Sequence, residues 1–226
     1  MMEENFKLQT PNSRETSKLK LQSLLMGWLA AAVGYLLAGC ATPKFGGIDE
    51  YKQLTTQGDT VLRASLRSLE LVSANLGHCT PKTMSDFQHA VQRLQVDSIR
   101  IRARARAIQA RGDEYFGSWE QSMAGIKDPR MRDAANRSHA ELQDSFAKIK
   151  VASQKAGAAF DPYLAGLLKL RVELENRSGN VDNEADRELI RNASAKGQEA
   201  LREIGVIDSE LVSMKKMLKS RYREAH

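Results

Sequence analysis

The sequence predicts an all-α fold, an elongated antiparallel bundle of about four long helices with coiled-coil character. Apolar residues recur at spacings of three, four and seven in four long segments, which is the pattern of amphipathic helices. The composition also favours long helices, since aromatic residues make up only 6% of the chain and it has only five prolines. No segment has the alternation of branched and aromatic residues that indicates ordinary strands.

The first helix is expected from about residue 48 to residue 76. A stripe of leucines at heptad spacing marks its buried face, with Ser73 in the one missing place: Leu62, Leu66, Leu69 and Leu76. Gly77 stands just past the end, which is a common position for the residue that follows a helix.

The second helix is expected from about residue 82 to residue 123. Its apolar residues recur every seven positions: Phe87, Leu94, Ile101, Ile108 and Tyr115. Within it, residues 98–107 alternate apolar and basic side chains, which is the period of a strand. We nevertheless predict a helix, because the seven-residue repeat continues through this segment without a shift and arginine and alanine favour helices.

The third helix is expected over residues 129–175 and the fourth over about 182–221, with a turn at 176–180 between them. Asp128 is suited to cap the third helix and Pro129 to be its first residue. Pro162 lies inside the same segment and lacks an amide hydrogen, so we expect it to kink the helix or to split it near Asp161.

Residues 37–40 read Leu-Ala-Gly-Cys and end the most apolar stretch of the chain. A basic start, an apolar stretch and small residues form a secretory signal, and the following Cys40 resembles the bacterial lipoprotein signal. The interpretation is a signal peptide over 1–39, a lipidated tether over 40–47 and a helical domain over 48–226. The alternative, an uncleaved membrane-spanning anchor, is less favoured, because the purely apolar part is only about 14 residues long.

Lipidation of Cys40 would attach the protein to a membrane of the bacterial envelope. Ala41 follows the cysteine, and by resemblance to the Gram-negative sorting rule it favours the outer membrane, with the domain facing the periplasm. Cys79 is then a lone thiol, which we interpret as a loop residue. His78 and Cys79 do not provide the four ligands of a zinc site, so neither a metal nor a cofactor is predicted.

Four arginines of the second expected helix form a basic ridge beside its apolar seam: Arg93, Arg100, Arg104 and Arg111. They fall within about 40° of one another around the helix. The ridge has three interpretations, which are a solvated flank paired with acids, a site for an anionic lipid, lipopolysaccharide or acidic polymer, and a nucleic-acid site. Nucleic acid is the least favoured, because an envelope lipoprotein rarely meets it.

Enzyme chemistry is not predicted. The chain has no Gly-x-Ser-x-Gly sequence and no glycine-rich phosphate loop, and its acidic pairs lack a recognisable catalytic partner. The leading hypothesis is a non-enzymatic helical interaction or structural module of the envelope, with an envelope protein as partner. The alternative is a binding or chaperone-like protein that holds an anionic envelope ligand through the basic ridge.

From Tyr115 onward the chain resembles a bacterial lipoprotein family, domain-of-unknown-function family 2959. The residues that carry the resemblance are the pairs 119–120 and 137–138, three apolar residues and the run 162–164: Trp119, Glu120, Arg137, Ser138, Leu142, Phe146, Ile149, Pro162, Tyr163 and Leu164. The resemblance implies an envelope location and a helical fold, and it assigns no catalytic residue.

Overall fold

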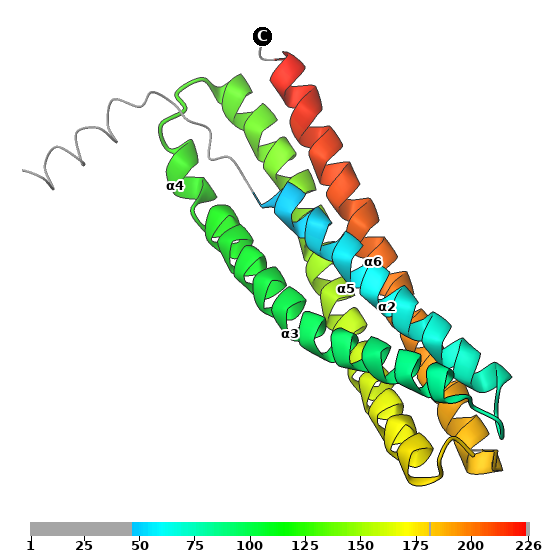
Figure 1. The fold of residues 1–226 in the computed structure, drawn as a ribbon. Helices are drawn as coiled ribbons and strands as arrows, with labels where there is room; N and C mark the ends of the chain where they lie inside the picture. Colours follow the sequence, from blue (N-terminus) through cyan, green and yellow to red (C-terminus); the bar gives the residue numbers. More distant parts are fainter. Residues whose placement is uncertain (1–46, 181, 225–226) are drawn as a thin grey trace, which may run out of the picture. The chain divides into compact units, whose positions relative to one another are not determined.

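The fold is an all-α helical bundle (Figure 1). The computed structural model describes residues 47–180 and 182–224, and these residues contain no strand. The helices are α2 (Ile48–Ala74), α3 (Pro81–Gly117), the short α4 (Trp119–Met123), α5 (Pro129–Asn176) and α6 (Glu184–Glu224). The predicted signal peptide and Cys40 lie outside the described residues.

The four long helices form an antiparallel ring in which α2 and α5 each pack between α3 and α6. Side-chain contacts fix the directions. Arg111 near the end of α3 binds Glu50 in the first turn of α2, at 2.8 Å. Gln88 near the start of α3 donates to Glu175 near the end of α5, at 3.0 Å. Helices α2 and α5 therefore lie diagonally opposite each other and run in the same direction.

The predicted helix ends are confirmed by their capping contacts. The Asp128 carboxylate accepts a hydrogen bond from the Arg130 amide at 2.8 Å, and Pro129 is the first residue of α5. Gly77 has a φ of 81° and Gly179 a φ of 84°, so both adopt the left-handed backbone conformation that glycine permits after a helix. Helix α2 ends at Ala74 and α5 at Asn176, within two residues of the predicted ends and shortly before these glycines.

Of the two alternatives expected at Pro162, a kink or a split, the split does not occur, since α5 is continuous from Pro129 to Asn176. Proline removes the hydrogen bond to the carbonyl four residues earlier, which is that of Ala158. Both Pro162 and Ala158 are exposed, so water can replace the lost donor at the surface. Tyr163, on the buried side, keeps α5 packed on its neighbours.

The second expected helix is interrupted, since α3 ends at Gly117 and α4 begins after Ser118. Glycine disfavours a helix by about 1 kcal/mol, and the Ser118 hydroxyl bonds the Tyr115 carbonyl at 3.2 Å. One seam assignment is also wrong, since Val72 is buried in place of Ser73.

The interior of the bundle contains two hydrophobic cores. The first core surrounds Leu69 and Tyr163 and reaches the loop that holds Cys79. The second core surrounds Ile108 and Phe146, near the start of α2. A hydrogen bond joins α2 to α5 across each of them, from Ser65 to Tyr163 and from Tyr51 to Ser153, both at 2.8 Å.

Candidate functional site

The four arginines of the basic ridge lie on one exposed side of α3. Arg111 binds Glu50 at 2.8 Å, and Arg100 lies 3.9 Å from Asp97 on its own helix. Neither Arg93 nor Arg104 forms a hydrogen bond or an ion pair with another described residue. The ridge is therefore only partly neutralised by acids, and two of its cations point into solvent.

An exposed apolar stripe runs beside the basic ridge on the outer face of α3. Its two large members are Val96, 53% exposed, and Ile99, 68% exposed. Exposed alanines continue it at the helical spacings of four and three residues: Ala103, Ala107 and Ala110. We call these five residues the outer stripe. The seven-residue repeat indicates the inner seam of this helix but not its outer apolar face.

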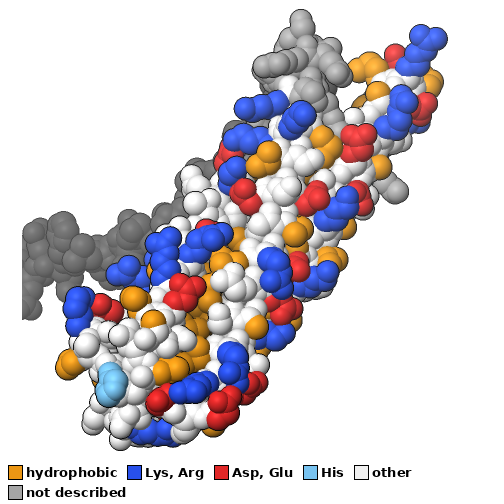
Figure 2. Space-filling view, turned by 90° about the vertical axis from the view of Figure 1, so that its right-hand side faces the viewer, with side chains coloured by type: hydrophobic (Ala, Val, Ile, Leu, Met, Phe, Trp, Pro, Cys, Tyr) orange, Lys and Arg blue, Asp and Glu red, His pale blue; other side chains and the backbone are white. Residues whose placement is uncertain are grey.

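The charge of this part of α3 is strongly one-sided. Residues 87–112 contain six arginines and one acid, Asp97. By contrast, the face drawn in Figure 2 carries acidic and basic side chains side by side. The outer side of α3 therefore combines an excess of positive charge with exposed apolar area.

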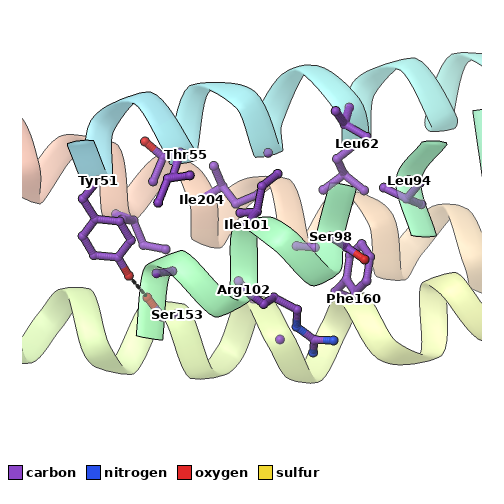
Figure 3. A pocket seen from close by; sticks show the side chains of 18 residues that line it. Tyr51, Thr55, Leu62, Leu94, Ser98, Ile101, Arg102, Ser153, Phe160 and Ile204 are labelled. Carbon is purple, nitrogen blue, oxygen red and sulfur yellow. Dashed lines mark hydrogen bonds between the residues drawn. The ribbon is translucent and has the colours of Figure 1, made fainter. Parts of the chain in front are cut away.

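A cavity of about 150 Å³, partly open to solvent, lies in the bundle between the first and the second core (Figure 3). Residues of all four long helices line it. Helix α5 packs less closely against α3 than against α6. Its larger wall residues include Leu62, Leu94, Ile101 and Ile204, and Tyr51 closes one end. Small residues form much of the remaining wall: Gly58, Ser98, Ala105, Ser153, Ala156, Gly157 and Ala200.

Among the described residues that line this cavity, Arg102 is the one charged residue. Its Nη2 atom donates to Asp161 of α5 at 2.7 Å, and its guanidinium lies 5.3 Å from the centre of the Phe160 ring. A Cβ atom at Gly157 would lie 3.6 Å from the same Nη2. The side chain thus bridges α3 and α5, a position that the sequence analysis did not single out because Arg102 lies off the ridge.

An aromatic group closes the second core where α3 meets α4. The His139 ring stacks on Trp119 at 4.4 Å between centroids, and it lies 5.3 Å from Phe116. The Nε2 atom of His139 is buried and finds no hydrogen-bond partner among the described residues. Burial lowers the pKa of this histidine below its usual value, so the neutral ring is favoured.

Cys79 lies in the loop before α3, and its thiol packs in the first core. The Sγ atom donates to the Asn75 carbonyl at 3.3 Å, and burial raises the pKa of the thiol. A buried thiol with a raised pKa is a poor nucleophile. The described residues contain no cluster of three or more histidine, cysteine or acidic side chains that could hold a metal ion.

Comparisons with known proteins identify no relative: no family model, curated protein or solved structure matches the chain. The resemblance to family 2959 therefore stays a hypothesis. In the part of the chain that the structure describes, every helix is too short in its apolar part to cross a membrane.

Proposed function

We propose that this chain is a non-enzymatic, lipid-anchored protein of the bacterial envelope whose basic ridge and outer stripe contact an anionic lipid surface. Its proposed location is the outer membrane, facing the periplasm, with attachment through lipidated Cys40. The observation that carries the proposal is the pair Arg93 and Arg104, two exposed cations that have no acidic partner among the described residues and lie beside an exposed apolar stripe. The resemblance to the lipoprotein family 2959 supports the same location.

The chemistry of the outer side of α3 suits a lipid interface. A helix that presents apolar side chains flanked by arginines can lie in the plane of a bilayer surface, with the cations at the headgroups. Each basic residue near an anionic surface contributes about 1 kcal/mol of binding. Arg100 and Arg111 should contribute less than Arg93 and Arg104, because Asp97 and Glu50 already compensate their charge.

The length of the tether is compatible with this contact. The chain from Cys40 to Ile48 can span at most about 29 Å, at 3.3–3.6 Å per residue. The ridge from Arg93 to Arg111 is about 27 Å long, at 1.5 Å per helical residue. Arg111 binds Glu50 in the first turn of α2, so a lipid on Cys40 would keep this end of the ridge within reach of the membrane.

The anchor is tested by fatty-acid labelling in cells. Wild-type protein should take up labelled palmitate and run as the processed form. Cys40→Ala should give an unlabelled, unprocessed precursor, because the acceptor thiol is missing. Cys79→Ala is the matched control and should be labelled like the wild type. Labelling that persists in Cys40→Ala would refute the lipid anchor.

The ridge is tested by vesicle binding of the mature chain with Cys40→Ser, which removes the lipid. Vesicles of phosphatidylglycerol and phosphatidylcholine are compared with phosphatidylcholine alone. The double variant Arg93→Gln/Arg104→Gln should bind the anionic vesicles about 30-fold more weakly, which corresponds to about 1 kcal/mol for each cation. The matched control Arg100→Gln/Arg111→Gln should lose less, and 1 M salt should weaken wild-type binding.

Two results would count against a lipid contact through the basic ridge. Equal binding of wild type and Arg93→Gln/Arg104→Gln to anionic vesicles would exclude the ridge as the lipid contact. A large loss of thermal stability in the same variant would instead mean that these arginines support the fold. We expect only a small stability change, since single surface charges contribute about 0–1 kcal/mol.

A further inference from the structure

We infer that the cavity between the two cores binds the hydrocarbon end of a small carboxylate amphiphile, with Arg102 holding the carboxylate at the rim. This site lies inside the bundle, whereas the proposed membrane contact lies on the outer side of α3, so the two are independent. The inference rests on three features, which are the wall of the cavity, the satisfied polar groups around it and the position of Arg102.

The wall of the cavity contains many small residues. Helices α2, α3, α5 and α6 each contribute glycine, alanine or serine to it, while the two cores on either side of the cavity along the bundle axis contain large apolar side chains. Ser98 and Ala105 occupy seam-side positions of α3. An empty apolar cavity of about 150 Å³ destabilises a protein, yet a cavity of this size can hold a molecule such as benzene.

The polar groups of the wall do not require a polar ligand. Tyr51 bonds Ser153 at 2.8 Å and accepts a hydrogen bond from Gln109 at 2.6 Å. The Thr55 hydroxyl donates to the Lys52 carbonyl at 2.8 Å. Because these groups are satisfied within the protein, a water molecule in the cavity would find few partners, and an apolar group is the favoured occupant.

Arg102 supplies the one charge that an amphiphile could bind at this site. A guanidinium has five N–H donors in a planar fork that matches a carboxylate. The hydrogen bond to Asp161 occupies Nη2, and the Asp161 side chain is itself largely exposed. A surface ion pair of this kind contributes about 0–1 kcal/mol, so a ligand carboxylate can compete with Asp161 at little cost.

The size of the cavity limits the ligand. It accommodates a benzene-sized group, so the long chains of a bilayer lipid do not fit inside as a whole. A medium-chain carboxylate can bury its distal carbons in the cavity while its headgroup stays at Arg102. Octanoate is therefore a suitable probe, and octanol is the uncharged probe of the same chain length.

The experiment is calorimetric titration of the mature chain, carrying Cys40→Ser, with octanoate and with octanol. We expect both to bind, and octanoate to bind more tightly. Arg102→Gln should weaken octanoate by up to about fivefold, which corresponds to the roughly 1 kcal/mol of a surface ion pair, and leave octanol unchanged. Asp161→Asn should strengthen octanoate, because it frees the guanidinium. Failure of both probes to bind the folded wild-type chain would overturn the inference.

A variant with a larger side chain in the cavity tests whether the probes bind there. Ala105→Leu should abolish binding of both probes while the thermal midpoint stays the same or rises, because the new side chain occupies the empty volume. Ala103→Leu, on the outer face of the same helix, is the matched control and should bind both probes normally. Ser98→Val is a second filling variant if Ala105→Leu does not fold. Normal binding by a folded filling variant would overturn the inference.

The two proposals can fail separately. Arg93→Gln/Arg104→Gln should bind octanoate normally even if it no longer binds anionic vesicles. Arg102→Gln should bind vesicles almost like the wild type, since Arg102 lies off the ridge and is paired with Asp161. Loss of octanoate binding in the ridge variant, with Arg102 intact, would mean that octanoate binds the outer side of α3, which overturns the cavity inference.

Discussion

Two glycines show how the first core differs from the middle of the bundle. In the first core, a Cβ at Gly197 would lie 2.8 Å from Leu66 Cδ2 and 2.9 Å from Tyr163 Cε2. In the middle, a Cβ at Gly58 would meet nothing closer than Ile204 Cδ1 at 3.9 Å. The absent side chain permits close contact at Gly197, whereas at Gly58 it leaves a void. The same residue therefore serves tight packing in one region and open space in the other.

The largest expected difference is in the free energy of unfolding that is lost when one large apolar side chain in each region is replaced by alanine. Leu167 is 0% exposed in the first core, so Leu167→Ala should lower the free energy of unfolding by about 2–5 kcal/mol. Ile204→Ala, at the half-buried cavity wall, should cost clearly less, because fewer contacts are lost beside an existing void. Urea unfolding of both variants measures the difference. Equal losses would mean that the cavity region is as tightly packed as the core.

The next expected effect is a change in stability on replacement of each glycine by alanine, with opposite signs at the two positions. Gly197→Ala should destabilise by about 1–3 kcal/mol, because its methyl group would overlap Leu66 and Tyr163. Gly58→Ala should stabilise by about 0.5–1 kcal/mol, because alanine favours a helix and its methyl group has room. Thermal unfolding of the two variants checks both signs. Stabilisation by Gly197→Ala would contradict the packing described for the first core.

The smallest expected effect concerns His139 at the edge of the second core. Burial lowers its pKa in the folded chain, so the folded state binds this proton less readily than the unfolded state. The stability that the neutral ring contributes is therefore complete above the unfolded pKa of about 6.5 and is lost as the pH falls through the lowered folded value. Stability curves between pH 7.5 and 5 should fall less steeply for His139→Gln than for the wild type. Parallel curves would exclude this contribution.

The fold was largely predictable because each long helix carries its own apolar repeat and its own end signals. The residues around Asp128, Gly77 and Gly179 determine their helix ends locally, without help from distant parts of the chain. The break at Ser118 and the continuous helix through Pro162 were not predictable in this way. Continuity through Pro162 depends on which side of the helix faces solvent and on the packing of Tyr163. At Ser118 the local signal is a single Gly-Ser pair, which alone does not distinguish a break from a continuous helix.

The candidate sites were predictable only in part. The basic ridge follows from helical spacing alone, and its exposure agrees with that analysis. The partners of Arg111 and Arg102 are acids that lie 61 and 59 residues away in the sequence, so no local pattern reveals them. The cavity is a sum of small residues from four helices. Each small residue is ordinary in its own helix. The cavity exists only because the bundle brings these small residues together at one position along its axis.

The first turn of α2 is the point at which any pull on the preceding chain enters the bundle. Asp49 and Glu50 hold this turn to α6 and α3 through Lys215 and Arg111, and Ile48 and Tyr51 are buried beside them. A force applied there along the helix axis would have to slide the whole of α2, 27 residues long, past both neighbours at once. We expect this shear geometry to resist mechanical unfolding better than a pull that peels the same turn away from α3 and α6, which single-molecule force spectroscopy with two pulling directions can compare.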